Sequence, residues 1–429
     1  MSDLAVDIHV SSLTDRLRSG AWLDRRRVVA YAGILLALEL AATLFLVAGT
    51  HGWIVKLDRP NTTDFISFYA AGSLADSGSA QAAYNQTLHL AAEEQASAAG
   101  IKYVYFFYPP VFMLLCAGLA RLPYLVAFGV FELGTLIPFV LAIRRIVTRS
   151  AFAILPVLAF PAVLINIGVG QNAFLTAALF AGATLLVDKK PIVAGLLFGA
   201  LAYKPHFGLL VPVALAAGGN WKAFGAAALS ALTLVLASTF FFGVESWQGF
   251  LTAIGGSHET YEAGKVDFAA FVSPFGAMRL IGLSPGAAYI VQAAATIAAA
   301  IAVVRAWHSR APLPVRAATL IAGTLVALPL ALFYDMVLAM VAAAWLLRAA
   351  LAGGFKPWEK TTLAVLFVAP LATRGVGTAL HLPLGFAAGI ALLVLCIRRI
   401  ESNSYLDATN DSRIDAKSLL SFNNTTATA

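Results

Sequence analysis

Long uninterrupted runs of apolar residues recur from one end of the chain to the other and constrain its fold more than any other feature. Most runs are about 15 to 22 residues long and rich in Ala, Leu and Gly, as membrane-crossing helices are. An outer-membrane barrel would instead show strands of about ten residues with alternating polarity. The runs predict an all-α polytopic membrane protein and lie near residues 28–49, 104–120, 123–143, 151–168, 171–187, 191–203, 206–219, 222–243, 285–306, 314–333, 335–350, 361–378 and 382–398.

The composition agrees with a membrane protein and argues against a nucleic-acid partner. Of 429 residues, 60% are hydrophobic and only 12% are charged, which is more apolar surface than one water-soluble core can bury. The formal charge of +7 does not indicate nucleic-acid binding, because the Lys and Arg residues form short clusters at the ends of apolar runs. Cys116 and Cys396 lie far apart in apolar segments, so no disulfide framework is expected.

Clusters of Lys and Arg between the runs predict how the chain threads the membrane. Arginines between residues 16 and 27 precede the first run, and no small-residue cleavage pattern follows it, which indicates an uncleaved first helix that begins in the cytoplasm. Keeping the later clusters in the cytoplasm requires one of two runs, 104–120 or 123–143, not to cross fully. The first of these opens with Tyr108-Pro109-Pro110 and is the favoured partial or re-entrant segment; alternatively, the whole assignment shifts by one.

This threading divides the chain into three parts. Residues 1–27 form a cytoplasmic segment, residues 28–400 form a membrane domain with about 12 transmembrane helices (roughly 10 to 13), and residues 401–429 form a disordered cytoplasmic tail. Five polar features then face the non-cytoplasmic side: the first external loop at 50–103 with its juxtamembrane helices, the second external loop at 244–284, and the short segments 166–172, 203–207 and 332–335.

Asp64 is the first candidate for catalysis. It opens the stretch DFISFYAAGSL, in which Phe65, Phe68, Tyr69 and Gly72 fall at helical spacing and predict a helix that lies on the lipid surface. As an N-cap, the Asp64 carboxylate would satisfy free N–H groups at the helix start. As a general base at the membrane boundary, it would take a proton from an acceptor hydroxyl. The residues alone leave both interpretations open.

Lys204 interrupts an otherwise apolar stretch, ALAYKPHFGLL, and the following Pro205 breaks the helix there. An ammonium group beside freed backbone amides is suited to binding a phosphate. Alternatively, Lys204 is a snorkelling residue at a tight turn. His206 either helps to bind the same ligand or caps the turn.

Asp335 and the neighbouring Tyr334 lie between two long apolar runs. A carboxylate within the membrane boundary should face a polar cavity, where it would bind a sugar hydroxyl or orient a cation, whereas in a loop it needs no such role. Gln171 and Asn172 also separate two apolar runs. Their amides either hydrogen-bond sugar hydroxyls or hold helices together.

Arg279 in the second external loop and Arg374 near the external end of a late helix are further candidates for binding a phosphate. The sequence contains no P-loop, no GxGxxG fingerprint, no HExxH and no Cys/His metal motif, so it gives no support for ATP hydrolysis, dinucleotide chemistry or zinc catalysis. No cytoplasmic domain that could bind a nucleotide sugar is evident. Any sugar donor is therefore expected to be membrane-borne.

Five motifs together resemble those of glycosyltransferase family 87 (DUF2029), over roughly residues 30 to 400. They occur in the family's order and are DFISFYAAGSL with YN at 64–85, YPPVFMLL with LARLP at 108–123, GQNAFLTAAL at 170–179, AGLLFGALAYKPHFGLL at 194–210 and YDMVL at 334–338. This family comprises bacterial membrane enzymes of the GT-C fold, including polyprenyl-phosphate-mannose-dependent α-mannosyltransferases of glycolipid assembly.

The resemblance implies inverting transfer of a mannose-like hexose or a pentose from a polyprenyl phosphate to a lipid or glycan acceptor, on the periplasmic side of the bacterial inner membrane. Asp64 would be the general base, and Lys204 with Pro205 would recognise the donor phosphate. Mannosyltransferase members carry a histidine near the late external motif, where this chain has Tyr334 and Asp335. Because fixed cations can stabilise the leaving phosphate, no cofactor or obligatory divalent cation is expected.

Two other functions remain as alternatives. A transporter or flippase for a lipid-linked sugar would require broken helices in two related halves, and the sequence shows only the break at 203–207 and no internal repeat. In a purely structural membrane subunit, Asp64 would be a helix cap and Lys204 a snorkelling residue.

Overall fold

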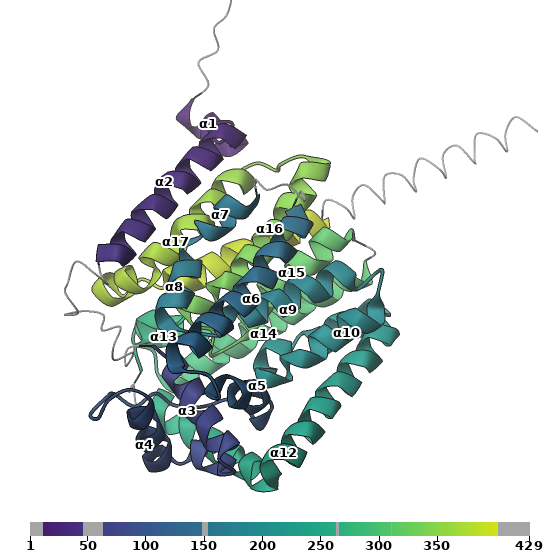
Figure 1. The fold of residues 1–429 in the computed structure, drawn as a ribbon. Helices are drawn as coiled ribbons and strands as arrows, with labels where there is room; N and C mark the ends of the chain where they lie inside the picture. The colour runs from purple at the N-terminus through teal and green to yellow at the C-terminus, as the bar shows by residue number, and fades with distance from the viewer. Residues whose placement is uncertain (1–11, 46–62, 148–152, 263–265, 310, 402–429) are drawn as a thin grey trace, which may run out of the picture.

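The computed structural model of the protein is described here for residues 12–45, 63–147, 153–262, 266–309 and 311–401, with no account of the side chains of 257–262. Within these ranges the chain is almost entirely helical, and the only β-type pairing is an antiparallel bridge between Phe271 and Leu332. The expectation of an all-α membrane protein is confirmed. Figure 1 shows α3, α4 and α5 together at one end of the molecule and α1 at the other.

Six helices are long and apolar enough to cross a membrane: α2 (Arg25–Leu44), α6 (Tyr124–Val147), α12 (Trp221–Glu262), α14 (Pro285–His308), α16 (Val337–Gly353) with the turn before it, and α17 (Glu359–Leu380). Shorter apolar helices accompany them: α5 (Pro110–Ala120), α9 (Ala173–Leu186), α10 (Pro191–Gly199), α11 (Val211–Ala217) and α15 (Leu313–Ala327). A last helix covers 384–401. The total of about 12 crossings stays a prediction.

The remaining helices are short and flank these spans. They are α1 (Leu13–Ser19), α3 (Phe65–Asp76), α4 (Gln86–Ala96), α7 (Ile154–Leu158), α8 (Pro161–Val169) and α13 (Pro274–Leu280). Five 3₁₀ turns join them: η2 (Ala80–Tyr84), η4 (Ala200–Tyr203), η5 (Pro205–Gly208), η6 (Phe268–Ala270) and η7 (Phe333–Met336).

Two of the predicted runs and one predicted loop have different boundaries in the structure. The run at 104–120 becomes helical only at Pro110, and the resulting 11-residue α5 is too short, at roughly 16 Å, to span a bilayer. The run at 151–168 splits into α7 and α8, because Pro161 cannot continue the preceding helix. The expected loop at 244–284 is helical up to Glu262, since α12 continues beyond a kink at Gly243.

Helix α3 is a core helix, which corrects the expectation that it lies on the lipid surface. Phe65, Phe68 and Ala71 are fully buried or nearly so. Gly72 lies so close to α5 that a Cβ atom built on it would be 2.2 Å from the carbonyl oxygen of Cys116. The helix is apolar on nearly every side, and such a helix is buried rather than interfacial.

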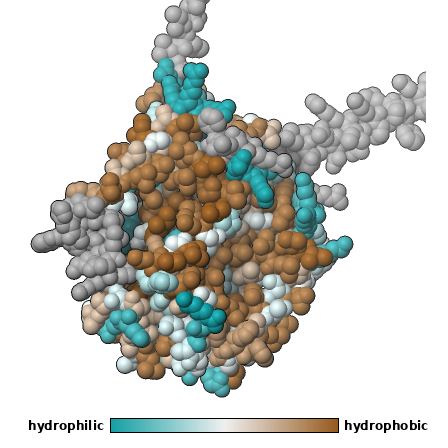
Figure 2. Space-filling model, viewed as in Figure 1, coloured by the Kyte–Doolittle hydropathy of each residue, from teal (hydrophilic) through white to brown (hydrophobic). Residues whose placement is uncertain are grey.

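The main core lies between α9, α15 and α16. Twelve of the 15 residues of α15 are buried, and the buried Trp345 of α16 donates a hydrogen bond to Thr184 of α9. Figure 2 shows that hydrophobic residues cover most of the visible face of the molecule, while hydrophilic residues gather toward its margins. An apolar exterior around an apolar core is the arrangement expected of a protein solvated by lipid.

Several helix ends carry cationic residues that are held by polar partners. Arg316 pairs with Asp188 at 2.7 Å, and Arg348 donates to the carbonyl oxygen of Ile146. Arg399 and Glu359 form a buried ion pair at the start of α17, which α1 contacts. These contacts hold Arg316, Arg348 and Arg399 at the ends of their helices, and the threading of the chain through the membrane stays a prediction.

Candidate active site

Four segments far apart in the sequence supply one connected group of polar side chains. Asp64 precedes α3, Gln171 and Asn172 precede α9, Lys204 lies between η4 and η5, and Asp335 lies in η7. The backbone N–H of Val272 also donates to the carbonyl oxygen of Ala331, which ties the expected loop at 244–284 to the same place. These features therefore lie together in the structure, and the side of the membrane that they face stays a prediction.

Asp64 occupies the N-cap position of α3, but its side chain caps nothing. Its backbone is helical (φ −67°, ψ −15°), so its carboxylate does not accept a hydrogen bond from the first turn. The carboxylate instead accepts a hydrogen bond from Gln171, with 2.9 Å between Nε2 and Oδ2. The capping interpretation is thus wrong, and the half-buried carboxylate is available for another role.

The surroundings of Asp64 change its acidity in two opposing ways. Burial raises the pKa of the Asp64 carboxyl above its ordinary value of 3.8, while the hydrogen bond from Gln171 and the positive charge of Arg374 act to lower it. Burial has the larger effect, so the net shift is upward. A carboxylate with a raised pKa is a better proton acceptor than an ordinary surface aspartate.

The orientation of the Gln171 amide is set by its other contacts. Its Oε1 accepts hydrogen bonds from the Tyr108 hydroxyl and from the backbone N–H of Asn172, each at 3.2 Å. Both of these partners are donors, so the NH₂ group is the end that faces Asp64. Sequence analysis named Tyr108 only as part of the YPP motif and missed this contact.

Lys204 and Asp335 form a buried ion pair at the centre of the group. The Lys204 Nζ lies 2.8 Å from Oδ1 of Asp335 and 3.3 Å from Oδ1 of Asn172, and the two charged side chains are only 4% and 1% exposed. Sequence analysis assigned them to separate ligands, a phosphate and a sugar or cation. The structure instead shows each as the other's partner, and Asp335 also accepts the N–H of Leu332 at 3.0 Å.

Aromatic side chains surround this ion pair. The Lys204 Nζ lies 4.3 Å from the ring centroid of Phe207 and 5.6 Å from that of Tyr334. Cation–π contacts of this kind are strongest where water is excluded. The exposed His206 contacts the Phe207 ring at a centroid distance of 5.0 Å and so borders the group rather than belonging to it.

Arg374 and Arg279 contact two consecutive residues at the start of η6. Arg374 pairs with Asp267 at 3.0 Å, and both side chains are about half exposed. Arg279 lies 5.0 Å from the ring of Phe268 and donates to the carbonyl oxygen of Leu283 at 2.8 Å. Arg374 is close enough to influence the Asp64 carboxyl electrostatically, and its exposure leaves it free to meet a ligand.

Two further polar residues support the group and were not identified from the sequence. Asn166 of α8 donates to the carbonyl oxygen of Gln171 at 2.8 Å, and it also donates to Glu132 of α6 at 3.3 Å. The available signal was Glu132 itself, the only carboxylate in the apolar run at 123–143. Such a residue inside a span is by default a functional candidate.

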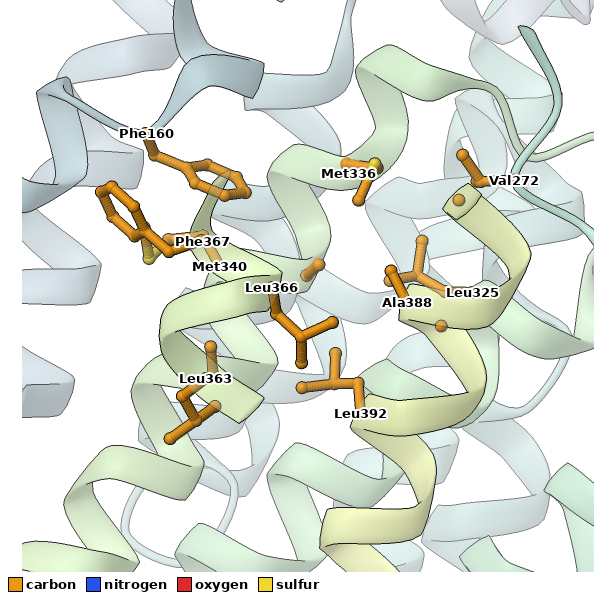
Figure 3. A pocket seen from close by; sticks show the side chains of 14 residues that line it. Phe160, Val272, Leu325, Met336, Met340, Leu363, Leu366, Phe367, Ala388 and Leu392 are labelled. Atoms are coloured by element: carbon orange, nitrogen blue, oxygen red, sulfur yellow. The ribbon is translucent and has the colours of Figure 1, made fainter. Parts of the chain in front are cut away.

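Figure 3 shows a cleft that is lined only by apolar side chains. It is bordered by α8, α15, α16, α17 and the helix at 384–401, and its 14 lining residues include Phe160, Met340, Leu366 and Leu392. Met336, which follows Asp335 directly, is one of them. A cleft with only apolar side chains around it offers no hydrogen-bond partner to a polar group.

No group of three or more His, Cys, Asp or Glu side chains with metal-binding geometry occurs in the part of the chain that the structure describes. The carboxylates of the site are instead engaged by Gln171 and by Lys204.

Comparison with known proteins identifies the family. The model of glycosyltransferase family 87 matches residues 106–333, slightly more than half of the chain, and this region contains Gln171, Asn172 and Lys204. No curated protein and no solved structure matches the chain. The match, together with a membrane-type fold that gathers a carboxylate, amides and cations in one place, shows that the chain belongs to glycosyltransferase family 87.

Proposed function

We propose that the protein transfers a sugar from a polyprenyl-phosphate donor to a hydroxyl group of a lipid or glycan acceptor, at the periplasmic face of a bacterial inner membrane. The observation that carries this proposal is the half-buried Asp64 carboxylate, which caps no helix and is held by the amide of Gln171. The sugar is a mannose-like hexose or a pentose.

Asp64 acts as the general base. One of its oxygens takes the proton of the acceptor hydroxyl while that hydroxyl oxygen bonds to the anomeric carbon. The bond from that carbon to the donor phosphate oxygen breaks, and its electron pair leaves with the phosphate. A single displacement inverts the anomeric carbon, and base catalysis of this kind contributes about 10²- to 10⁴-fold in rate.

Cations at the site stabilise the charge that develops on the leaving phosphate. Arg374 is the best placed, because its exposed pair with Asp267 is worth only about 0.2–1 kcal/mol and is readily exchanged for a phosphate. Arg279 lies beside the same turn. Lys204 is the innermost cation, and a phosphate would share its charge with Asp335.

Polar groups around Asp64 bind the sugar and the acceptor. The Gln171 amide beside Asp64, the Asn172 amide and the Tyr334 hydroxyl near Lys204, and the His206 imidazole at the border of the group supply both donors and acceptors for sugar hydroxyls. With fixed cations in place, the reaction needs no divalent metal ion, and we expect transfer to persist in the presence of EDTA.

The apolar cleft beside Met336 holds the prenyl chain of the donor. It begins one residue from Asp335, so a lipid lying in it would bring its phosphate to the Lys204–Asp335 pair. Burial of each CH₂ group there contributes about 0.8 kcal/mol, as in any apolar site.

The test compares wild-type protein with Asp64→Asn and with Asp76→Asn as a matched control. Asp76 ends the same helix and pairs with Arg121 at the surface, so its substitution makes the same chemical change away from the site. Each purified protein is incubated with a panel of polyprenyl-phosphate sugars and a membrane-lipid extract, and products are read by mass spectrometry.

We expect a new glycoconjugate from wild type and Asp76→Asn, and at least a hundredfold less from Asp64→Asn, because an amide cannot accept the proton. Equal product from all three proteins would remove Asp64 from the mechanism. No product from any donor, together with movement of a lipid-linked sugar across vesicles, would favour the transporter instead.

A further inference from the structure

A buried carboxylate lies inside the membrane-type helix α6, and the mechanism above makes no use of it. Glu132 is 4% exposed, in the third turn of a helix that is otherwise almost entirely apolar. Burying a carboxylate inside an apolar membrane helix costs free energy, so a residue of this kind is a candidate for a functional role.

The contacts of Glu132 are asymmetric. Its Oε2 accepts a hydrogen bond from Nδ2 of Asn166 at 3.3 Å, while its buried Oε1 has no hydrogen-bond partner among the described residues. A carboxylate placed only to join two helices would ordinarily have both oxygens satisfied. Among the described residues, the bond from Asn166 is therefore the one hydrogen bond that the Glu132 carboxylate accepts.

Asn166 closes the turn that carries Gln171. Its Nδ2 donates to the carbonyl oxygen of Gln171 at 2.8 Å, and its Oδ1 accepts from the N–H of Ala173 at 3.2 Å. Both Nδ2 partners are acceptors and the Oδ1 partner is a donor, so only one orientation of this amide satisfies all three contacts. Glu132 is one of the two acceptors that hold the amide in that orientation.

The bonds of Asn166 hold this turn so that the Gln171 side chain faces Asp64. The Nε2 of Gln171 donates a hydrogen bond to the Asp64 carboxylate at 2.9 Å. The backbone N–H of Asp64 donates to the carbonyl oxygen of Val169, which lies in the same turn as Gln171. We propose that Glu132 is a positioning residue for the general base and acts by fixing Asn166, which holds the turn that aims Gln171 at Asp64. This inference rests on the proposed function.

Two substitutions of Glu132 distinguish an effect of its hydrogen bond to Asn166 from an effect of its packing. Glu132→Gln keeps an oxygen that accepts from Asn166, whereas Glu132→Met keeps nearly the same length and removes the acceptor. Thr135→Val is the matched control, since Thr135 is buried on the same helix and its hydroxyl bonds only to the helix's own carbonyl oxygens.

The measurement is kcat and KM for sugar transfer as a function of pH. We expect kcat of Glu132→Met to fall about 10- to 100-fold with little change in KM, because a base that is slightly misplaced loses rate rather than substrate affinity. The acid limb of its profile should move to higher pH, since the bond from Gln171 favours the ionised form of Asp64. Glu132→Gln and Thr135→Val should resemble wild type.

Several outcomes would overturn the proposal. They are an unshifted acid limb in Glu132→Met, an equal loss of rate in Glu132→Gln, or an equal loss in Thr135→Val. If Glu132→Met does not fold, Asn166→Ala interrupts the same route from its other side and must produce the same shift.

A readout without catalysis keeps this proposal distinct from the proposed function. Hydrogen exchange at the amides of residues 170–173 should quicken in Glu132→Met and stay slow in Glu132→Gln. A wild-type protein that transfers no sugar would defeat the proposed function alone, whereas unchanged exchange in Glu132→Met would defeat the positioning role alone.

Discussion

At the scale of residues, the site holds two carboxylates in contrasting surroundings. Asp335 is buried, and its two oxygens accept hydrogen bonds from the Lys204 ammonium group and from the backbone N–H of Leu332. Asp64 is half-buried and receives a single side-chain hydrogen bond from an amide. Two acidic groups in unlike environments take unlike roles, which supports our proposal that Asp64 is the base and Asp335 a supporting group.

The Lys204–Asp335 pair should reveal its structural contribution in a double-mutant cycle. Removing one partner leaves a buried uncompensated charge and costs about 3–5 kcal/mol, so Lys204→Met and Asp335→Leu should each lower the unfolding temperature strongly. The double substitution should recover most of that loss, because no charge is left buried.

The readouts are thermal unfolding in detergent and binding of a polyprenyl-phosphate sugar. We expect the double variant to be stable but to bind the donor weakly, since it lacks the innermost cation of the site. A double variant as unstable as either single one would show that the two residues do not act as a pair. Full donor affinity would show that Lys204 does not contact the phosphate.

At the scale of elements, the position of Asp64 depends on how closely α3 approaches α5. Gly72 makes that approach possible, since a side chain there would overlap the backbone at Cys116. The tight packing fixes the start of α3 and with it the base. A helix anchored on both sides by apolar contacts is a rigid support for a catalytic group.

Gly72→Ala should therefore impair both stability and activity. Its Cβ would lie 2.2 Å from the Cys116 carbonyl oxygen, so α3 must shift, and we expect a loss of about 1–3 kcal/mol in the free energy of unfolding. Gly118→Ala is the matched control, because a Cβ there meets nothing within 4 Å. Unfolding in denaturant and the rate of transfer test both variants, and equal effects of the two would contradict this account.

The helices themselves were predictable from the sequence, whereas their burial was not. Apolar runs predict where helices form. Pro161 marks a helix break inside one such run, and an average of hydropathy over that run does not reveal the break. The spacing of Phe65, Phe68 and Gly72 fits a surface helix and a buried one equally well. Whether α3 is buried or on the surface depends on its packing against α5. Residues distant from α3 in the sequence make that packing.

The sequence predicted which residues lie in the site but not which of them contact one another. The threading argument brought Asp64, Gln171, Lys204 and Asp335 to one surface, because each lies at the same end of an apolar run. Sequence order carries no information on which of these side chains meet, so the Lys204–Asp335 pair could not be foreseen. Glu132 was missed because its partner Asn166 lies 34 positions away on another helix.

At the scale of the whole molecule, the two ends differ in chemistry. Figure 1 shows α1 at one end and α3 and α5, beside the candidate active site, at the other. The buried Arg399–Glu359 pair lies at the start of α17, which α1 contacts. Positive residues favour the cytoplasmic side of a membrane. The arrangement thus predicts that Asp64 and its partners face the periplasm, where a membrane-borne donor is the only practical source of an activated sugar.

Cysteine labelling tests this orientation directly. Both native cysteines are buried, so a membrane-impermeant maleimide should label engineered cysteines selectively. Ser77 is exposed at the end of α3, and Ser309 is exposed after α14. In intact bacterial cells with a permeabilised outer membrane, Ser77→Cys should react and Ser309→Cys should react only after lysis. The reverse pattern would place the site in the cytoplasm, where soluble nucleotide sugars are available, and would remove the main reason for a polyprenyl-phosphate donor.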